Sequence, residues 1–292
     1  MLDMRDYMKK IIYWLEMVAF TSFGKVMRIL PERVCYLFAT ALGLIGYHLL
    51  KKRRLITIKN ISYAFPELKF RDWERIAKQS YISMAMSYVE FFWSEQLLKS
   101  GRIVVDNPDI LDAAVALNKG VVMVSLHIGN WELGCTLGSF GYRLYDVARR
   151  QNNPFFNKII EDRREKNGLQ VVYKGEGARK YLQIFKREKA IIILPADQHD
   201  TDIPIVFFGR QTTAPRGPAV LAVKFGAPMV LTYVYRDANK NHHIKVDKEI
   251  AIVPGTSVDD SVQKTMQSIY SEYERVIREH PEQYFWVHNR FK

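Results

Sequence analysis

Residues 121–132 of the chain read VVMVSLHIGNWE, and this stretch indicates both a fold and a candidate site. The mostly apolar and β-branched run 121–126 has the length and composition of a buried strand, and it ends at His127. Gly129 permits a turn, and Glu132 follows the histidine in the next segment. A strand of this kind would place an imidazole at the edge of a sheet, with a carboxylate close by.

The sequence pattern changes near residue 103, where short runs rich in β-branched residues begin to alternate with runs of helical pattern. Besides the run above, we expect strands at 103–105, 171–173, 191–194, 229–235 and 244–246, and helices at 111–117, 131–140, 154–167, 178–188, 217–225 and 261–279. This alternation predicts an α/β fold with a mixed, largely parallel central sheet flanked by helices. Residues 1 to about 100 read as helical.

Two apolar stretches, 11–23 and 34–50, lie near the start of the chain, and the second is followed by the basic cluster Lys51-Lys52-Arg53-Arg54. A spanning helix needs about 20 apolar residues, and both stretches fall slightly short. We therefore expect residues 1–55 to form a helical membrane-associating segment that binds from the cytoplasmic side, and residues 56–292 to form the α/β domain. A single membrane span and a plain soluble helical hairpin remain alternatives.

The charge balance is strongly basic, with 43 Lys and Arg against 31 Asp and Glu, a net charge of +12. Such a surface favours a polyanionic partner, which nucleic acid, anionic lipid or an acidic protein would each provide. The two cysteines, Cys35 and Cys135, match no metal-binding spacing, and we expect them to be buried thiols. The sequence contains no Gly-x-Ser-x-Gly, Walker or Rossmann glycine pattern.

Polar residues follow two of the expected strands at the point where each strand ends. His127 follows the strand at 121–126, and Asp197-Gln198 follows the strand at 191–194. Ligands gather at the carboxyl ends of such strands, so we expect these residues to face one cleft. An imidazole accepts a proton near neutral pH, and a carboxylate on its other ring nitrogen fixes the tautomer. Glu132 is the nearest carboxylate after the histidine, in the first turn of a helix expected to begin at Asn130.

The stretch His127-Ile-Gly-Asn-Trp-Glu132 resembles the His-x4-(Asp/Glu) motif of lysophospholipid-type acyltransferases. The Gly-Asn-Trp-Glu version is typical of the bacterial lipid A late acyltransferases and of the related acyltransferases of phosphatidylinositol mannosides. Further segments resemble elements of that family in the same order: 60–67, 149–154, 164–168, 197–198, 207–209, 213–218 and 281–292. The chain departs from the pattern at Ala148, where an aromatic residue is usual.

The resemblance implies a glycerolipid acyltransferase-like fold and a membrane-associated enzyme at the cytoplasmic face of the bacterial inner membrane. Such an enzyme moves a fatty acyl chain from an acyl thioester, usually on acyl carrier protein, to a hydroxyl of a glycolipid, here a lipid A precursor. It implies no cofactor, no metal ion and no nucleic acid. By analogy, His127 deprotonates the acceptor hydroxyl, Glu132 orients His127, and the hydroxyl attacks the thioester directly.

The resemblance also implies residues that bind the substrate. Arg149 and Arg164 would bind acceptor phosphate or stabilise the oxyanion, since guanidinium groups suit both tasks. Three more residues are expected to bind substrate or to hold the site in place: Asn130, Asp197 and Gln198.

Three other functions fit parts of the sequence. The acceptor could be another glycolipid, such as a phosphatidylinositol mannoside, and a hydrolase would use His127 to activate water. A basic membrane-binding or nucleic-acid-binding protein without catalysis would give His127 no special role.

Overall fold

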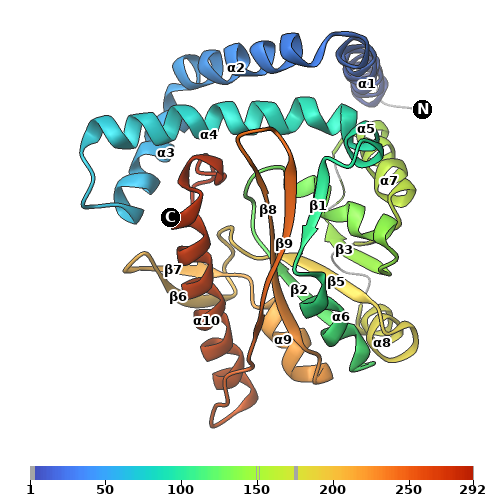
Figure 1. The fold of residues 1–292 in the computed structure, drawn as a ribbon, viewed down its shortest axis with the longest axis vertical. Helices are drawn as coiled ribbons and strands as arrows, with labels where there is room; N and C mark the ends of the chain where they lie inside the picture. Colours follow the sequence, from blue (N-terminus) through green and yellow to red (C-terminus); the bar gives the residue numbers. More distant parts are fainter. Residues whose placement is uncertain (1–3, 149, 151, 174–176, 292) are drawn as a thin grey trace.

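A seven-stranded sheet forms the centre of the protein, shown as a computed structural model in Figure 1. The structure describes residues 4–148, 150, 152–173 and 177–291. The sheet consists of β1 (Ile103–Asp106), β2 (Val121–Ser125), β3 (Leu144–Ala148), β4 (Leu169–Tyr173), β5 (Ile191–Pro195), β8 (Met229–Arg236) and β9 (His242–Ile250). Its order is β1-β9-β8-β2-β5-β3-β4, and only the β8–β9 pair is antiparallel. The mixed, largely parallel sheet predicted from the sequence is therefore confirmed.

Helices surround this sheet and also precede it in the chain. They are α1 (Met4–Ile29), α2 (Glu32–Leu49), α3 (Lys51–Ala64), α4 (Phe70–Glu90), η1 (Phe91–Trp93), α5 (Ser94–Lys99), α6 (Pro108–Ala116), η2 (Trp131–Phe140), α7 (Pro154–Lys166), α8 (Ala178–Leu182), η3 (Gln183–Glu188), α9 (Gly217–Phe225), α10 (Val258–Glu279) and η4 (Pro281–Gln283). The segment expected to be helical at 131–140 is the 3-10 helix η2, and η3 is a π-helical turn that continues α8.

Three strands were not expected from the sequence. β3 carries Asp146 in its middle, and this carboxylate interrupts the apolar pattern of a buried strand. The other two, β6 (Ile203–Phe207) and β7 (Arg210–Ala214), form a separate antiparallel hairpin. Phe208 and Gly209 form its turn with positive φ angles of 49° and 69°. β6 alternates buried and exposed residues, as a strand with one solvated face does, but Pro204 lies within it.

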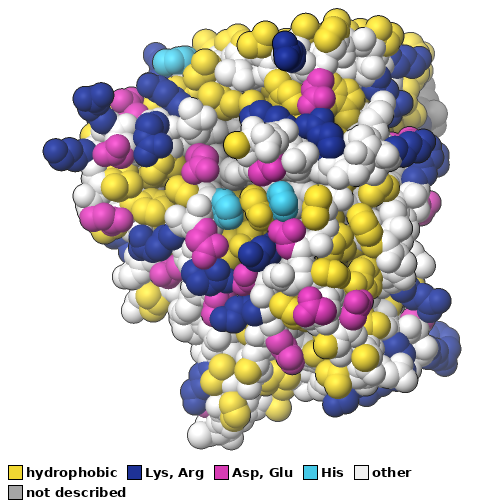
Figure 2. All heavy atoms as spheres, in the orientation of Figure 1, with side chains coloured by type: hydrophobic (Ala, Val, Ile, Leu, Met, Phe, Trp, Pro, Cys, Tyr) yellow, Lys and Arg dark blue, Asp and Glu magenta, His cyan; other side chains and the backbone are white. Residues whose placement is uncertain are grey.

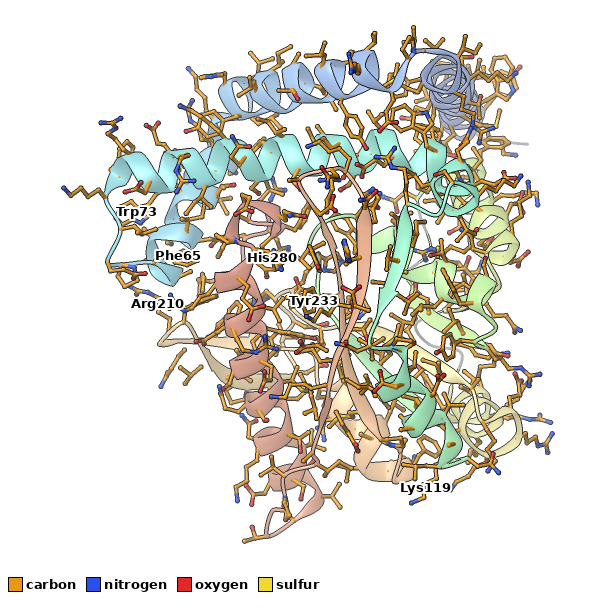
Figure 3. All side chains as sticks on the ribbon, in the orientation of Figure 1. Phe65, Trp73, Lys119, Arg210, Tyr233 and His280 are labelled. Carbon is orange, nitrogen blue, oxygen red and sulfur yellow. The ribbon has the colours of Figure 1, made fainter. Side chains whose placement is uncertain are left out.

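The two faces of the sheet contribute to two hydrophobic clusters, because alternate residues of a strand point in opposite directions. On β2, Val122 and Val124 belong to the cluster that includes α9 and α10, whereas Val121 and Met123 belong to the cluster that includes α6 and η2. Figure 3 labels two residues on the α10 side, Tyr233 of β8 and His280 just after α10, whose ring centroids lie 6.0 Å apart. The core is thus formed on both faces of the central sheet.

The N-terminal helices pack on the rest of the protein at several places: α2 and α3 contact α4, and α1 contacts α7 and η1. Figure 1 shows α2 and α4 lying side by side above the sheet. They approach closely at Gly43, where a Cβ atom would come within 2.6 Å of the Cα of Ile82. The domain boundary expected after residue 55 falls within α3. Among the described residues, no single helix is long and apolar enough to cross a membrane; α2 and α3 pass that test only as a pair, which is bent by 94°.

Candidate active site

The parallel register of β2 and β5 brings His127 and Asp197 together. Ser125 pairs with Pro195 at the carboxyl ends of these strands, so the residues two positions further on emerge side by side. The Nδ1 atom of His127 lies 2.7 Å from Oδ1 of Asp197, and the His127 backbone N–H donates to Oδ2 at 3.2 Å. The Asp197 side chain is 1% exposed. The convergence of these two strand ends, expected from the sequence, is confirmed.

This contact fixes the chemistry of the imidazole. A carboxylate only accepts hydrogen bonds, so Nδ1 carries the proton and Nε2 keeps its lone pair in the neutral ring. Burial lowers the pKa of His127, but the charge and hydrogen bond of Asp197 outweigh it, and the net shift is upward from 6.5. Burial raises the pKa of Asp197, yet His127 reverses this, so the Asp197 carboxyl titrates below its usual range.

Glu132 does not make the contact with His127 that the sequence predicted. It lies in the first turn of η2, as expected, but its Oε1 accepts a hydrogen bond from Nη2 of Arg164 at 3.0 Å. The described residues show no hydrogen bond between Glu132 and His127, because the strand register places Asp197 at Nδ1. The Glu132 charge still contributes to raising the pKa of His127. The orienting contact therefore belongs to Asp197.

Arg164 of α7 joins two carboxylates inside the site. Besides Glu132, it donates from Nη1 to Oδ2 of Asp146 on β3 at 2.8 Å. Burial lowers the pKa of Arg164, but both carboxylates raise it and the net shift is upward. Burial also raises the pKa of Asp146, and Arg164 opposes this only in part. The cluster of Glu132, Arg164 and Asp146 keeps the arginine charged and fixed in one orientation.

A pocket of about 440 Å³ lies against these side chains. Its polar lining includes His127, Glu132, Arg164 and Gln198, and the Nε2 atoms of His127 and Gln198 are 3.5 Å apart. The volume falls in the range of about 300–1,000 Å³ typical of ligand sites. Apolar residues of the strands also contribute to the lining: Met123, Val147, Leu169, Val171, Ile193 and Val234.

A second cavity of about 190 Å³ adjoins this pocket and is almost entirely apolar. Phe20 of α1, Tyr88 of α4 and Phe156 of α7 contribute to its walls. Trp131 and Ile160 line both cavities, as does Glu132. A polar pocket with a histidine and an apolar cavity therefore share one wall.

Two other residues expected at the site have different outcomes. Asn130 is 1% exposed, and its Nδ2 donates to Oε2 of Glu90 at 3.1 Å, so its amide is bonded to α4. Arg149 lies outside the described residues. Asp146 and Glu90 were not expected at the site from the sequence. Asp146 had one signal, a lone carboxylate in the otherwise apolar run 144–148.

Comparisons with known proteins identify the family of the chain. A sequence model of the family described as bacterial lipid A biosynthesis acyltransferase matches residues 4–292. A lipid A biosynthesis palmitoleoyltransferase of Escherichia coli (strain K12) is 24% identical over 271 residues, covering 90% of this chain and 86% of the relative. The lipid A biosynthesis lauroyltransferase of the same strain is 24% identical over 304 residues, covering 96% and 92%.

A third relative is shorter in its match. The phosphatidylinositol mannoside acyltransferase of Mycobacterium tuberculosis (strain ATCC 25618 / H37Rv) is 31% identical over 138 residues, which cover 45% of this chain and 44% of the relative. The family model and these relatives define the class of the protein, which is an acyltransferase, an enzyme that transfers an acyl group other than an aminoacyl group. The chain belongs to the bacterial lipid A biosynthesis acyltransferase family, and this membership supports action on a glycolipid.

Proposed function

We propose that this acyltransferase moves a fatty acyl chain from an acyl thioester to a hydroxyl of a lipid A precursor, with His127 as the general base. The observation that carries the proposal is the His127–Asp197 contact at the edge of the pocket. Nε2 of His127 removes the proton from the acceptor hydroxyl while the hydroxyl oxygen attacks the thioester carbonyl. The C–S bond then breaks, the thiolate leaves, and His127 returns the proton to the sulfur. No acyl-enzyme forms.

Glu132 and Arg164 act together in this proposal. The Arg164 guanidinium donates to Glu132 from Nε and Nη2 and to Asp146 from Nη1. Among these described contacts, the second N–H of Nη1 is left for a substrate oxygen. Because both carboxylates hold the guanidinium in place, it can meet a phosphate or a developing oxyanion without reorganising. The amide of Gln198, which lines the same pocket with its Nε2 atom 3.5 Å from Nε2 of His127, is the second proposed donor toward the reacting carbonyl.

The apolar cavity between α1, α4 and α7 is the proposed site for the acyl chain. It borders Trp131 and Glu132, so a chain lying in it would present its carbonyl to the pocket that contains His127. Its walls come largely from Phe20, Phe91 and Phe156, which offer no hydrogen bond to a polar ligand. Burial of each methylene of the chain there contributes about 0.8 kcal/mol.

The surface of α1 and α2 supports attachment to the cytoplasmic face of the inner membrane. Figure 2 shows hydrophobic side chains gathered along the edge of the molecule formed by α2. Ile29 is 83% exposed and Leu49 is 74% exposed, and Trp14 and Leu37 also face solvent. The basic residues at the start of α3 follow directly, which suits an interfacial element on anionic lipid. The charge of +12 likewise complements an acidic carrier protein as donor.

Product analysis tests the proposal. The purified protein is incubated with acyl carrier protein loaded with one fatty acid and with vesicles containing a lipid A precursor, and the lipids are analysed by mass spectrometry. We expect the precursor to gain one acyl group. Free fatty acid without acylated lipid would instead establish hydrolysis. Parallel vesicles with a phosphatidylinositol mannoside test the acceptor suggested by the mycobacterial relative, and preferential acylation of that lipid would contradict the lipid A assignment.

A further inference from the structure

A buried ion pair lies behind the turn that follows His127. Glu90, the last residue of α4, is 0% exposed, and Arg236, the last residue of β8, is also buried. Nε of Arg236 donates to Oε1 of Glu90 at 2.6 Å, and Nη2 donates to Oε2 at 2.5 Å. The Tyr36 hydroxyl of α2 donates to the same carboxylate at 3.0 Å. Neither charged residue lines the pocket or the apolar cavity.

The pair is bonded to the turn itself. Oε2 of Glu90 accepts the hydrogen bond from the Asn130 amide, and Nη2 of Arg236 donates to the Ser87 hydroxyl at 3.2 Å. Ser87 in turn donates to the carbonyl of Gly129 at 3.0 Å. The side chain and the backbone of the turn are thus both held by α4.

The opposite side of the turn is held by the segment after α10. The side-chain amide of Gln283 exchanges two hydrogen bonds of 2.8 Å with the backbone of Arg236. The backbone carbonyl of Gln283 accepts a hydrogen bond from the Gly129 N–H at 3.0 Å. Phe285 N–H donates to the carbonyl of His127 at 3.0 Å. The turn is therefore fixed between two elements, and Arg236 is bonded to both.

Burial of two charges is an expensive way to stabilise a protein, since apolar residues of similar volume often stabilise it as well or better. Burial raises the pKa of the Glu90 carboxyl, but Arg236 and His242 outweigh it and hold the pKa well below its usual range, so the charge is retained at neutral pH. A buried charged pair that is bonded to the turn after His127 is therefore better explained by a role in holding the geometry of this turn than by a contribution to the stability of the fold.

We propose that Glu90 and Arg236 are positioning residues for acyl transfer, which hold the turn 128–130 so that His127 stays aligned at the edge of the pocket. This inference rests on the proposed function. Because neither side chain reaches the substrate sites, their loss should affect the reacting geometry and leave substrate binding largely intact.

The test replaces the pair by apolar residues of similar volume, Glu90→Leu with Arg236→Met. We expect a folded protein whose kcat falls about 10²-fold, because misplacement of a catalytic group by about 1 Å has that effect. The KM for the acyl donor should change by less than about threefold, since uniform binding is untouched. Glu90→Gln with Arg236→Gln retains hydrogen-bonding groups and should recover part of the rate.

Two further variants keep the test decisive. Asn130→Leu leaves the ion pair intact and removes the direct bond from Glu90 to the turn, and it should lower kcat in the same way. Because Asn130 also lines the apolar cavity, kcat is measured at saturating acyl donor, which separates loss of the turn geometry from weaker donor binding. The control is Glu32→Leu with Arg102→Met, a 2.7 Å ion pair at the surface, which should keep the wild-type rate. Wild-type kcat in the folded apolar pair, equal loss in the control, or unfolding of both the apolar pair and Asn130→Leu would overturn the proposal. Absence of transfer by the wild type would instead reject the proposed function.

Discussion

Replacement of Asp197 by Asn is expected to reverse the tautomer of His127. Oδ2 of Asp197 accepts the backbone N–H of His127, and Oδ1 faces Nδ1. An asparagine that keeps its oxygen on the backbone N–H must turn its NH₂ group toward Nδ1. Nδ1 then becomes an acceptor, the ring proton moves to Nε2, and the base has no lone pair for the substrate. We expect kcat to fall by about 10²–10⁴-fold, the range for positioned proton transfer.

The pH dependence of the residual activity checks the same reasoning. A general base must be unprotonated, so wild-type kcat should rise with pH through an apparent pKa above 6.5, because Asp197 raises the pKa of His127. In Asp197→Asn the Asp197 charge no longer raises the pKa of His127, whereas burial still lowers it. The rise of kcat with pH should therefore move to lower pH. Steady-state kinetics with a labelled acyl donor measure both effects.

A matched control comes from β9 and β1, the pair of strands at one end of the sheet order. Nδ1 of His243 lies 3.1 Å from Oδ1 of Asp106, and neither residue lines the pocket. Asp106→Asn should therefore leave kcat and its pH dependence unchanged. The reasoning is refuted if folded Asp197→Asn keeps kcat within about threefold of the wild type with an unshifted pH profile.

Three other predictions concern the walls of the site. Arg164→Ala should lower acyl transfer far more than Arg163→Ala, because only Arg164 is bonded to Glu132 and Asp146 among the described contacts. The Arg163 guanidinium instead stacks on the Phe91 ring at 4.0 Å. Equal losses in initial-rate assays would contradict this prediction. Ile160→Trp should shift the donor preference toward shorter acyl chains, since Ile160 lines the apolar cavity. Competition between acyl donors of different length measures the shift, and an unchanged preference would place the acyl chain elsewhere. Gly129→Ala should destabilise the fold by at least about 1 kcal/mol, because the residue has a φ of +54° and a Cβ atom would lie 2.3 Å from the Val234 carbonyl oxygen. An unchanged midpoint of thermal unfolding would argue against this geometry.

Some of this architecture is local in origin and was accessible from the sequence. The run 121–126 and the run 191–194 each look like a buried strand, and parallel strands end at the same edge of a sheet. This was enough to expect His127 and Asp197 in one cleft. The apolar pattern likewise predicted most other strands of the sheet.

The parts that were missed depend on contacts between distant segments. The expectation for Glu132 rested on its closeness in sequence to His127, but Arg164, 32 residues further on, engages its carboxylate. The contact between Asn130 and Glu90 joins residues 40 positions apart, and no periodicity indicates it. β3 was missed because its central carboxylate, Asp146, is neutralised only in the fold, by the same arginine. Pairing of charges across a fold has no local signature.

The most direct test of the central claim is the single-turnover rate of glycolipid acylation by folded His127→Ala at saturating acyl donor, compared with His243→Ala. We predict a loss of at least about 10²-fold for His127→Ala and the wild-type rate for His243→Ala. Acylation by folded His127→Ala at the wild-type rate would show that another group removes the proton, and would contradict the mechanism.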